Sequence, residues 1–196
     1  MTKLAVTAVI LAGGRGERMG DEDKGLQLLQ GKPLVAWVAE SIAPQVDEVL
    51  VSANRNLDRY RELGFTVLPD AMPDFPGPLA GLHRVLGNLK TPLWLSVPCD
   101  TPFLPGDLVA RLLVALLAGD AELAVAKVED CMQPVICLGY AHLRTGLGDF
   151  LARGGRRVGE WQAGLRKVVA PFDCSELFHN INTLDELSKA ESARKH

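Results

Sequence analysis

The chain has 196 residues and a mass of 21.2 kDa, which is the size of one ordinary domain. Hydrophobic residues make up 47% of it and charged residues 23%, and this composition excludes a disordered chain and a fibrous repeat. The net charge of −3 and the pI of about 5.8 argue against the broad cationic face of nucleic-acid-binding proteins, so we expect no nucleic-acid partner.

The apolar runs bear on where the protein works. The first seven residues lack the run of about 7–15 apolar residues that defines a secretory signal. No segment reaches the roughly 18 uninterrupted apolar residues of a membrane span, since the best contender, residues 108–118, contains Arg111. We therefore expect a soluble, cytoplasmic protein with no membrane partner.

The four cysteines lie at positions 99, 131, 137 and 174. They form no C-x-x-C pair, and no histidine lies at metal-ligand spacing from any of them. We interpret them as buried or half-buried reduced thiols rather than as a zinc site or disulfides.

Strand and helix patterns alternate along the first 117 residues. The first strand is the continuous apolar run of residues 6–12, which stops at two glycines as a fully buried parallel strand does. The elements expected after it are a helix over 33–42 with Pro33 in its first position, a strand over 48–54, a helix over 57–63, a strand over 65–70, a helix over 79–90, a strand over 92–100 and a helix over 105–117. This alternation implies right-handed crossovers and a mostly parallel sheet with helices on both faces.

The second half of the chain is less regular. Strands are expected over 122–128 and 133–138, forming an antiparallel edge of the sheet, and over 165–172. The capping-box pattern of residues 183–186 opens a terminal helix. We therefore predict an α/β fold of three layers, α/β/α, in one domain over residues 1–196.

Ligands of such sheets bind beyond the carboxyl ends of the strands. The residues expected at four of these ends are the pair Gly13 and Gly14, Asn54, Asp70 and Asp100. Glycines, an amide and two carboxylates at neighbouring strand ends predict a binding site before any family is considered.

The loop after the first strand, residues 11–20 (LAGGRGERMG), is rich in glycine and is followed by the sequence DKG at 23–25. Glycines let backbone N–H groups converge on an anion, and Arg15, Arg18 and Lys24 add charged donors. Two common phosphate loops do not fit. Neither GL at 25–26 nor GKP at 31–33 supplies the Gly-Lys-Ser/Thr of the Walker pattern, and the last glycine is one residue too far for the dinucleotide fingerprint.

The pattern that fits is L-A-G-G-x-x-x-R-M-G-x-x-K, with one extra residue before the lysine. It resembles the signature loop of nucleotidyltransferases that attach a nucleoside monophosphate to a phosphorylated acceptor. An ordered set of motifs narrows the resemblance to the molybdenum cofactor guanylyltransferases, the MobA family of molybdopterin nucleotidyltransferases. The set comprises residues 18–20, 23–25, 31–34, 54–55, 70, 75–81, 98–102 and 180–183, and it spans about residues 9–187.

The resemblance implies a Rossmann-like nucleotidyltransferase fold and a reaction. In that reaction GMP passes from GTP to the phosphate of molybdenum-molybdopterin, pyrophosphate leaves, and the molybdopterin guanine dinucleotide cofactor forms. It also implies Mg²⁺ as cofactor and transient contacts with proteins that deliver the pterin or receive the product. Residues 1–105 would be the GTP-binding half and residues 106–196 the molybdopterin-side half.

The catalytic residues implied are Lys24, Asp100 and Arg18. Asp100 ends a buried strand, where a carboxylate can hold Mg²⁺ against triphosphate oxygens, and a turn or helix cap is its alternative role. Lys24 would neutralise charge on the leaving pyrophosphate, its alternative being an exposed surface lysine. Arg15 and Arg18 could do similar work, with one of them simply solvated.

The candidate GTP-binding residues are Leu11, Ala12, Gly13, Gly14, Arg15, Lys24, Asn54, Asp70, Gly77 and Asp100. The carboxylate of Asp70 is suited to accept from both N1–H and the exocyclic amine of guanine, and Asn54 could bond base or ribose. Turn chemistry is the alternative for both. Backbone groups of Leu11 and Gly77 would line the base pocket.

The candidate acceptor-binding residues are Gly81, Arg156, Arg157, Asn180 and Asn182. The two asparagines point the same way in an extended chain, and the resemblance puts them near the catalytic centre, with helix capping as the alternative. The two arginines would bind the molybdopterin phosphate, or form a solvated pair. The four histidines, at 83, 142, 179 and 196, are interpreted as structural or surface groups.

Three other functions stay open at this point. A sister cytidylyltransferase, acting on molybdopterin or on a small phosphorylated alcohol, shares the loop but needs donors for the cytosine acceptors in place of Asp70. A non-catalytic nucleotide or pterin carrier would not need Lys24 and Asp100 together with the full loop. A hydride-transfer enzyme of the Rossmann type is disfavoured by the glycine spacing.

Overall fold

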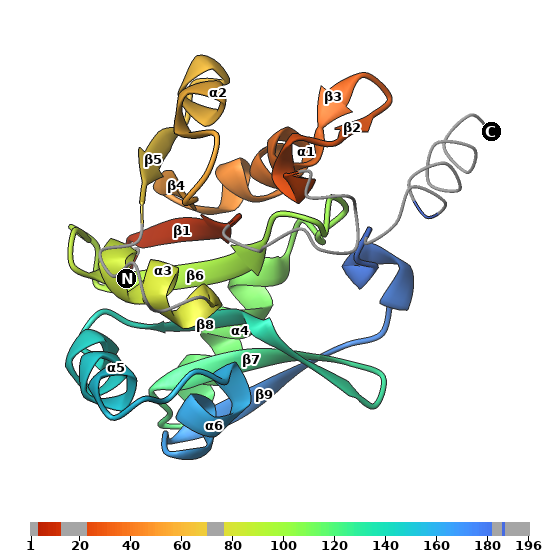
Figure 1. Ribbon diagram of the computed structural model, residues 1–196. Helices are drawn as coiled ribbons and strands as arrows, with labels where there is room; N and C mark the ends of the chain where they lie inside the picture. The colour runs from red at the N-terminus through yellow and green to blue at the C-terminus, as the bar shows by residue number, and fades with distance from the viewer. Residues whose placement is uncertain (1–3, 13–22, 70–76, 182–185, 187–196) are drawn as a thin grey trace.

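A seven-stranded sheet forms the centre of the computed structural model, which describes residues 4–12, 23–69, 77–181 and 186 (Figure 1). Its strands are β1 (Val6–Leu11), β4 (Glu48–Ser52), β5 (Thr66–Leu68), β6 (Leu93–Pro98), β7 (Leu123–Val128), β8 (Cys131–Tyr140) and β9 (Lys167–Phe172). Their order across the sheet is β5-β4-β1-β6-β8-β7-β9. Of these strands only β8 runs antiparallel to its neighbours, so the predicted mostly parallel sheet is confirmed.

Helices cover both faces of the sheet. They are α1 (Leu34–Ile42), α2 (Leu57–Glu62), α3 (Pro78–Leu86), α4 (Leu108–Ala118), α5 (Leu143–Ala152) and α6 (Val158–Ala163). Three short 3₁₀ segments add to them: η2 (Lys24–Leu26), η3 (Ala43–Gln45) and η4 (Ser175–Phe178). A two-stranded hairpin, β2 (Leu28–Leu29) with β3 (Lys32–Pro33), stands beside α1 (Figure 1).

Alternate strand residues supply two separate apolar cores, as the pleat of a strand requires. Ala8 and Ile10 of β1 pack on the side of α1, α2 and α4, together with Val38. Val9 packs on the other side with Leu82, where α3, α5 and α6 cover the sheet. Each fully buried aliphatic side chain contributes roughly 1.5–3 kcal/mol, which fixes the three-layer arrangement.

The strands predicted over 122–128 and 133–138 do pair antiparallel, as β7 with β8, but they do not form the edge of the sheet. The strand β8 is inside the sheet, between β6 and β7, and the edge is the parallel strand β9. Residues 136–138 of β8 are almost completely buried, which a strand inside a sheet needs and an edge strand does not. Two further bounds differ: Pro33 precedes α1 as its N-cap, and α3 ends at Leu86 because Gly87 follows as the C-cap.

The strand β8 carries a bulge close to the carboxyl end of β6. Val125 of β7 pairs with Cys137, but the next residue, Ala126, pairs with Gln133, so residues 134–136 are extra. Pairing between β6 and β8 stops at Ser96 and Cys137, although β6 continues to Pro98. The bulge therefore separates the end of β6 from the hairpin of β7 and β8.

Buried side chains satisfy the carbonyl groups of this bulge. Gln162 Nε2 of α6 donates to the Pro134 carbonyl at 2.8 Å, and Ser96 Oγ donates to the Val135 carbonyl. Both donor residues are only 2% exposed. An unpaired buried carbonyl would cost about 1–3 kcal/mol, so these two bonds stabilise the bulge.

The four cysteines are free thiols. Cys99 and Cys137 are buried as predicted, whereas Cys131 and Cys174 are exposed because each follows a turn or bend at the end of a hairpin or strand. No helix in the described part of the chain is both long and apolar enough to cross a membrane.

Candidate active site

The carboxyl ends of β5, β4, β1 and β6 meet at one edge of the sheet. Backbone hydrogen bonds continue the ladder beyond the strands: the Ala12 amide donates to the Ser52 carbonyl at 2.8 Å, and the Cys99 amide donates to the Leu11 carbonyl at 3.2 Å. These bonds fix the chain as far as Cys99. Asp100, the next residue, is thereby placed beside the end of β1.

Asp100 and Lys24 form an ion pair at this edge. Lys24 Nζ lies 3.5 Å from Asp100 Oδ2, and the Asp100 side chain is only 12% exposed. Asp100 Oδ1 is buried and has no hydrogen-bond partner among the described residues. Burial raises the pKa of the Asp100 carboxyl above its ordinary value, and the Lys24 ammonium opposes that rise. A buried carboxylate with one uncommitted oxygen fits a hard cation such as Mg²⁺.

The residue before Lys24 anchors the turn that carries it. Asp23 is the N-cap of η2, and its Oδ1 accepts from the Gly25 amide at 3.2 Å and from the Tyr60 hydroxyl at 2.5 Å. Its Oδ2 accepts from Asn56 Nδ2 at 3.1 Å. Burial raises the pKa of the Tyr60 phenol above its usual range, so the hydroxyl remains protonated and donates.

The end of the described chain returns to the same edge. After η4 the Ile181 amide donates to the Asp100 carbonyl at 2.8 Å, and Thr101 Oγ1 donates to Asn180 Oδ1 at 2.6 Å. Thr101 is completely buried. Asn180 therefore lies beside the strand end that carries Asp100.

A polar pocket of about 310 Å³ adjoins Asn180. It lies at the tip of the β7–β8 hairpin, and its lining includes Glu129, Cys131, Gln133, His179 and Asn180. A volume of this size is at the lower end of what small-molecule sites have.

Other predicted residues have defined positions. Asn54 is exposed just beyond β4, and Gly81 is buried inside α3. Gly77 is the N-cap of α3 at φ 145°, a conformation that favours glycine. Arg156 Nη1 donates to the carbonyls of Leu151 and Gly155.

Arg157 is exposed and pairs with Glu160 at 3.2 Å, as in the solvated alternative. The predicted residues Gly13, Gly14, Arg15, Arg18, Asp70 and Asn182 lie outside the described residues. The terminal helix opened by residues 183–186 does so as well, apart from Glu186.

Sequence reasoning gave no role to Tyr60, Asn56 or Thr101, which contact the site residues directly. Tyr60 occupies an apolar position of a short amphipathic helix, a pattern that indicates core packing and nothing more. Asn56 adopts φ 52°, the left-handed conformation that asparagine tolerates better than most residues. No pattern in the sequence indicates that Tyr60 and Asn56 contact Asp23 or that Thr101 contacts Asn180.

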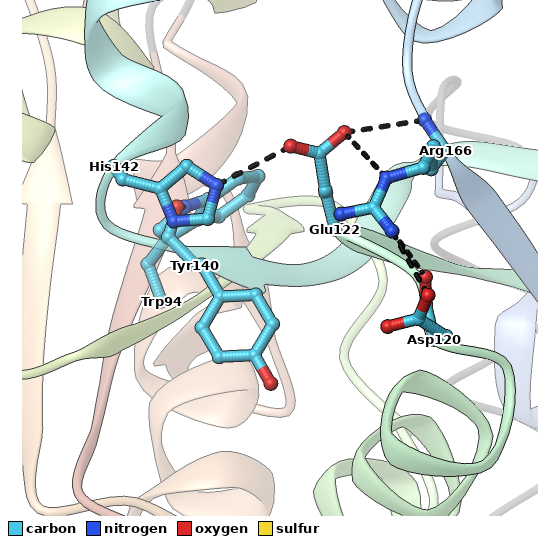
Figure 2. Close-up of polar contacts among 6 residues, drawn as sticks. All are labelled: Trp94, Asp120, Glu122, Tyr140, His142 and Arg166. Carbon is cyan, nitrogen blue, oxygen red and sulfur yellow. Dashed lines mark hydrogen bonds and ion pairs between the residues drawn. The ribbon is translucent and has the colours of Figure 1, made fainter.

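A second polar cluster lies at the opposite edge of the sheet (Figure 2). Glu122, just before β7, places Oε1 3.4 Å from His142 Nε2 and Oε2 3.6 Å from Arg166 Nε. Arg166 also pairs with Asp120 at 3.1 Å. The hydrogen bond with His142 and those with Arg166 lower the pKa of the Glu122 carboxyl. Both oxygens of this carboxylate have partners, so the cluster joins the ends of neighbouring strands.

A mostly parallel sheet between helices, with a lysine–aspartate pair where its strands end, is the arrangement of an α/β nucleotidyltransferase. Residues 8–168 match the model of the MobA-like NTP transferase domain. The chain belongs to this family.

Similar proteins cover nearly the whole chain. A protein of Cupriavidus metallidurans named molybdenum cofactor guanylyltransferase is 46% identical over 195 residues, which are 97% of this chain and 96% of the relative. A Shewanella protein with the same name is 49% identical over 184 residues, or 93% of each chain.

Solved structures share the fold at lower identity. Molybdopterin-guanine dinucleotide biosynthesis protein A of Archaeoglobus fulgidus has a TM-score of 0.78 at 22% identity, covering 96% of this chain and 98% of its own. The 2-C-methyl-D-erythritol 4-phosphate cytidylyltransferase of Thermus thermophilus has a TM-score of 0.69 at 20% identity, with coverage of 96% and 98%. The predicted nucleotidyltransferase fold is confirmed.

Proposed function

We propose that this protein is a molybdenum cofactor guanylyltransferase, which transfers GMP from GTP to the phosphate of molybdenum-molybdopterin and releases pyrophosphate. The observation that carries the proposal is the Lys24–Asp100 pair, in which one buried carboxylate oxygen has no partner among the described residues. The relatives at 46% and 49% identity, which carry that name over nearly their full length, support the choice of reaction.

Asp100 is the residue that would hold Mg²⁺. No group of three or more acidic, histidine or cysteine side chains that could hold a metal ion occurs in the described parts of the chain, so phosphate oxygens and water would supply most ligands. This is the usual way in which Mg²⁺ binds at nucleotide sites. When bound, the ion would neutralise charge on the phosphate oxygens during transfer.

Lys24 would neutralise the negative charge that grows on the leaving pyrophosphate. Its ammonium stays within 3.5 Å of Asp100 at an edge where phosphates can enter, and its side chain is 25% exposed. The acceptor phosphate, with a second pKa of about 6, is already mostly dianionic at neutral pH. In-line attack then depends on positioning and charge neutralisation more than on a general base.

The guanine base would be selected by Asp70, with Asn54 bonding base or ribose. One carboxylate accepts both adjacent donors of guanine, whereas cytosine presents acceptors at the equivalent positions. The backbone of Leu11, Ala12, Gly13, Gly14 and Gly77, with Arg15 and Arg18, would surround the nucleotide.

Molybdopterin would occupy the pocket beside Asn180. Its phosphate would have to reach the α-phosphorus near Asp100, and the pterin ring would then lie toward Glu129 and Gln133, which line the pocket. A pterin carries an N–H group and an amine, and the side-chain oxygens of glutamate and glutamine can accept hydrogen bonds from both. Asn180 and Asn182 would orient the acceptor, Gly81 would allow its close approach, and Arg156 and Arg157 would attract its charge.

We assign residues 1–105 to the GTP side and residues 106–196 to the molybdopterin side, acting in the cytoplasm. Proteins that deliver molybdopterin or receive the finished cofactor would dock transiently on the second of these parts. The bulged β8 and the pocket, which both belong to it, support this division.

Calorimetric binding of GTP, CTP, ATP and UTP with Mg²⁺ tests the nucleotide assignment. We expect a clear preference for GTP, and a roughly 10- to 100-fold loss of GTP affinity in Asp70→Ala because two hydrogen bonds to a charged group disappear. Asp58→Ala is the matched control, since this exposed aspartate of α2 pairs with Arg61. Pyrophosphate release from GTP with molybdenum-molybdopterin then tests the transfer.

Other results would favour the alternatives. Preference for CTP would identify a cytidylyltransferase and remove Asp70 as the base selector. Tight binding of GTP and molybdopterin without pyrophosphate release would identify a carrier.

A further inference from the structure

The turn that carries Lys24 is held in place by the buried hydroxyl of Tyr60. We propose that Tyr60 is a positioning residue for nucleotidyl transfer: its hydroxyl fixes Asp23, and Asp23 fixes the turn from which Lys24 reaches Asp100. This inference rests on the proposed function and names a residue that acts through the lysine.

Tyr60 itself has no freedom to move. Its side chain is completely buried in the core on the α1 side of the sheet, where it is one of the largest fully buried side chains. A hydroxyl at the tip of such a ring is a fixed point, and it donates to Asp23 Oδ1 at 2.5 Å. Hydrogen bonds to a charged acceptor are short and about twice as strong as neutral ones.

Asp23 connects the Tyr60 hydroxyl to the backbone around Lys24 through hydrogen bonds. The same Oδ1 accepts from the Gly25 amide, Oδ2 accepts from Asn56, and the Asp23 carbonyl accepts from the Leu26 amide at 3.0 Å. The Lys24 carbonyl accepts from the Gln27 amide at 3.1 Å. The residues on both sides of Lys24 are therefore held while its side chain extends toward Asp100.

Gly25 shows how closely the turn lies on the hydroxyl. A Cβ added at Gly25 would lie 2.5 Å from Tyr60 Oη, closer than real Cβ contacts. The glycine is therefore required by the hydroxyl and not by a left-handed backbone, since Gly25 is absent from the positive-φ glycines. The contact between turn and tyrosine leaves no space for the turn to slide.

Tyr60→Phe removes the hydroxyl and leaves the ring. We expect kcat for pyrophosphate release to fall about tenfold, with a smaller change in KM for GTP, because the lysine acts mainly on charge that develops in the transition state. The matched control is Tyr140→Phe, which removes the only other tyrosine hydroxyl, on a ring that stacks on His142 at the far edge (Figure 2). This control should keep the wild-type kcat.

A double-mutant cycle shows whether Tyr60 acts through the lysine. In a Lys24→Met background Tyr60→Phe should lower kcat no further, because the group that it positions is gone. A loss of equal size in both backgrounds would mean that Tyr60 supports the fold in general, and would overturn the proposal.

Hydrogen exchange supplies a readout that needs no turnover. The amides of residues 25–27 should exchange about tenfold faster in Tyr60→Phe, and at the wild-type rate in Tyr140→Phe. Unchanged exchange at these amides refutes the positioning role. If Tyr60→Phe does not fold, Asp23→Ala breaks the same contact from the half-buried side and takes its place. Wild-type protein that releases no pyrophosphate would contradict the proposed function alone, since the exchange experiment stands without it.

Discussion

Two carboxylates at opposite edges of one sheet show opposite behaviour. Asp100, at the carboxyl end of β6, is buried with one oxygen unpartnered among the described residues, and burial raises its pKa. Glu122, at the amino end of β7, has partners on both oxygens, and its hydrogen bonds lower its pKa (Figure 2). The first edge therefore holds a buried carboxylate, whereas at the second edge the carboxylate links the ends of three strands.

The difference separates a binding group from a structural one. An ionised carboxylate that is buried with one oxygen unpartnered lowers the free energy of unfolding, and a bound cation would offset this loss. A carboxylate with satisfied partners gains little from any further ligand. Variants of the two carboxylates, and of the cations beside them, test this difference.

The largest effect is expected from the paired variants Asp100→Asn and Glu122→Gln. Asp100→Asn should lower turnover at least about 10³-fold because the proposed metal ligand is lost. It should also raise the unfolding temperature, since a neutral amide is cheaper to bury than a charge. Glu122→Gln should leave turnover unchanged and lower the unfolding temperature. Initial rates and thermal unfolding measure both, and equal turnover losses in the two variants would contradict the distinction.

The cations beside these carboxylates allow the second comparison. Lys24→Met should reduce kcat about 10²- to 10³-fold, the usual cost of one group that stabilises developing charge. Arg166→Met should keep kcat and lower the free energy of unfolding by no more than about 1 kcal/mol, because Arg166 and its partner Asp120 are largely exposed. Kinetics and urea unfolding measure the two variants. A kinetic defect in Arg166→Met would show that the far edge is coupled to the site.

The smallest effect is a pH dependence at the far edge. The folded state lowers the pKa of Glu122, through its bond with His142 first, so it binds the proton less tightly than the unfolded chain does. The resulting stability is present above pH 4.5, the ordinary value, and is lost as the pH falls through the folded pKa. Urea unfolding of wild type and Glu122→Gln should differ by about 0.5 kcal/mol at pH 7, and the difference should disappear as the pH falls through the folded pKa of Glu122. A constant difference across this range would assign the effect to packing.

Sequence patterns were most informative where strands end. The apolar runs predicted β1, β4, β6 and β7 to within two residues, and the polar residues after them predicted the Asp100 edge. This succeeds because a parallel strand buried on both faces has a nearly continuous apolar sequence with abrupt limits. The small hairpin of β2 and β3 has strands of two residues, which leave no period to detect.

The helix α5 shows why other elements were missed. It contains Gly146 and Gly148, and glycine lowers helix propensity by about 1 kcal/mol per residue. Tertiary packing outweighs this cost, because a Cβ at Gly148 would lie 2.9 Å from His83 Nε2 of α3. Gly148 therefore weakens the helical pattern in the sequence and also allows α5 to approach α3 closely.

Within the site, the sequence predicted the charged groups but not what holds them. Lys24 and Asp100 belong to motifs and could be chosen one by one. The Tyr60–Asp23 bond joins residues 37 positions apart, and no local pattern encodes which core tyrosine has a polar partner. Such a pairing depends on the packing of α2 against η2, which only the folded chain defines.

The bond between Thr101 and Asn180 ties together residues 79 positions apart. A ribosome that adds roughly 5–20 residues per second emits the second partner about 4 to 16 seconds after the first. During that interval the nascent chain already holds Lys24 and Asp100 but lacks the segment that closes over Thr101. Synthesis from the N-terminus thus builds the part of the site with Lys24 and Asp100 first and the segment around Asn180 last, so a product that ends before Asn180 leaves Thr101 without this partner.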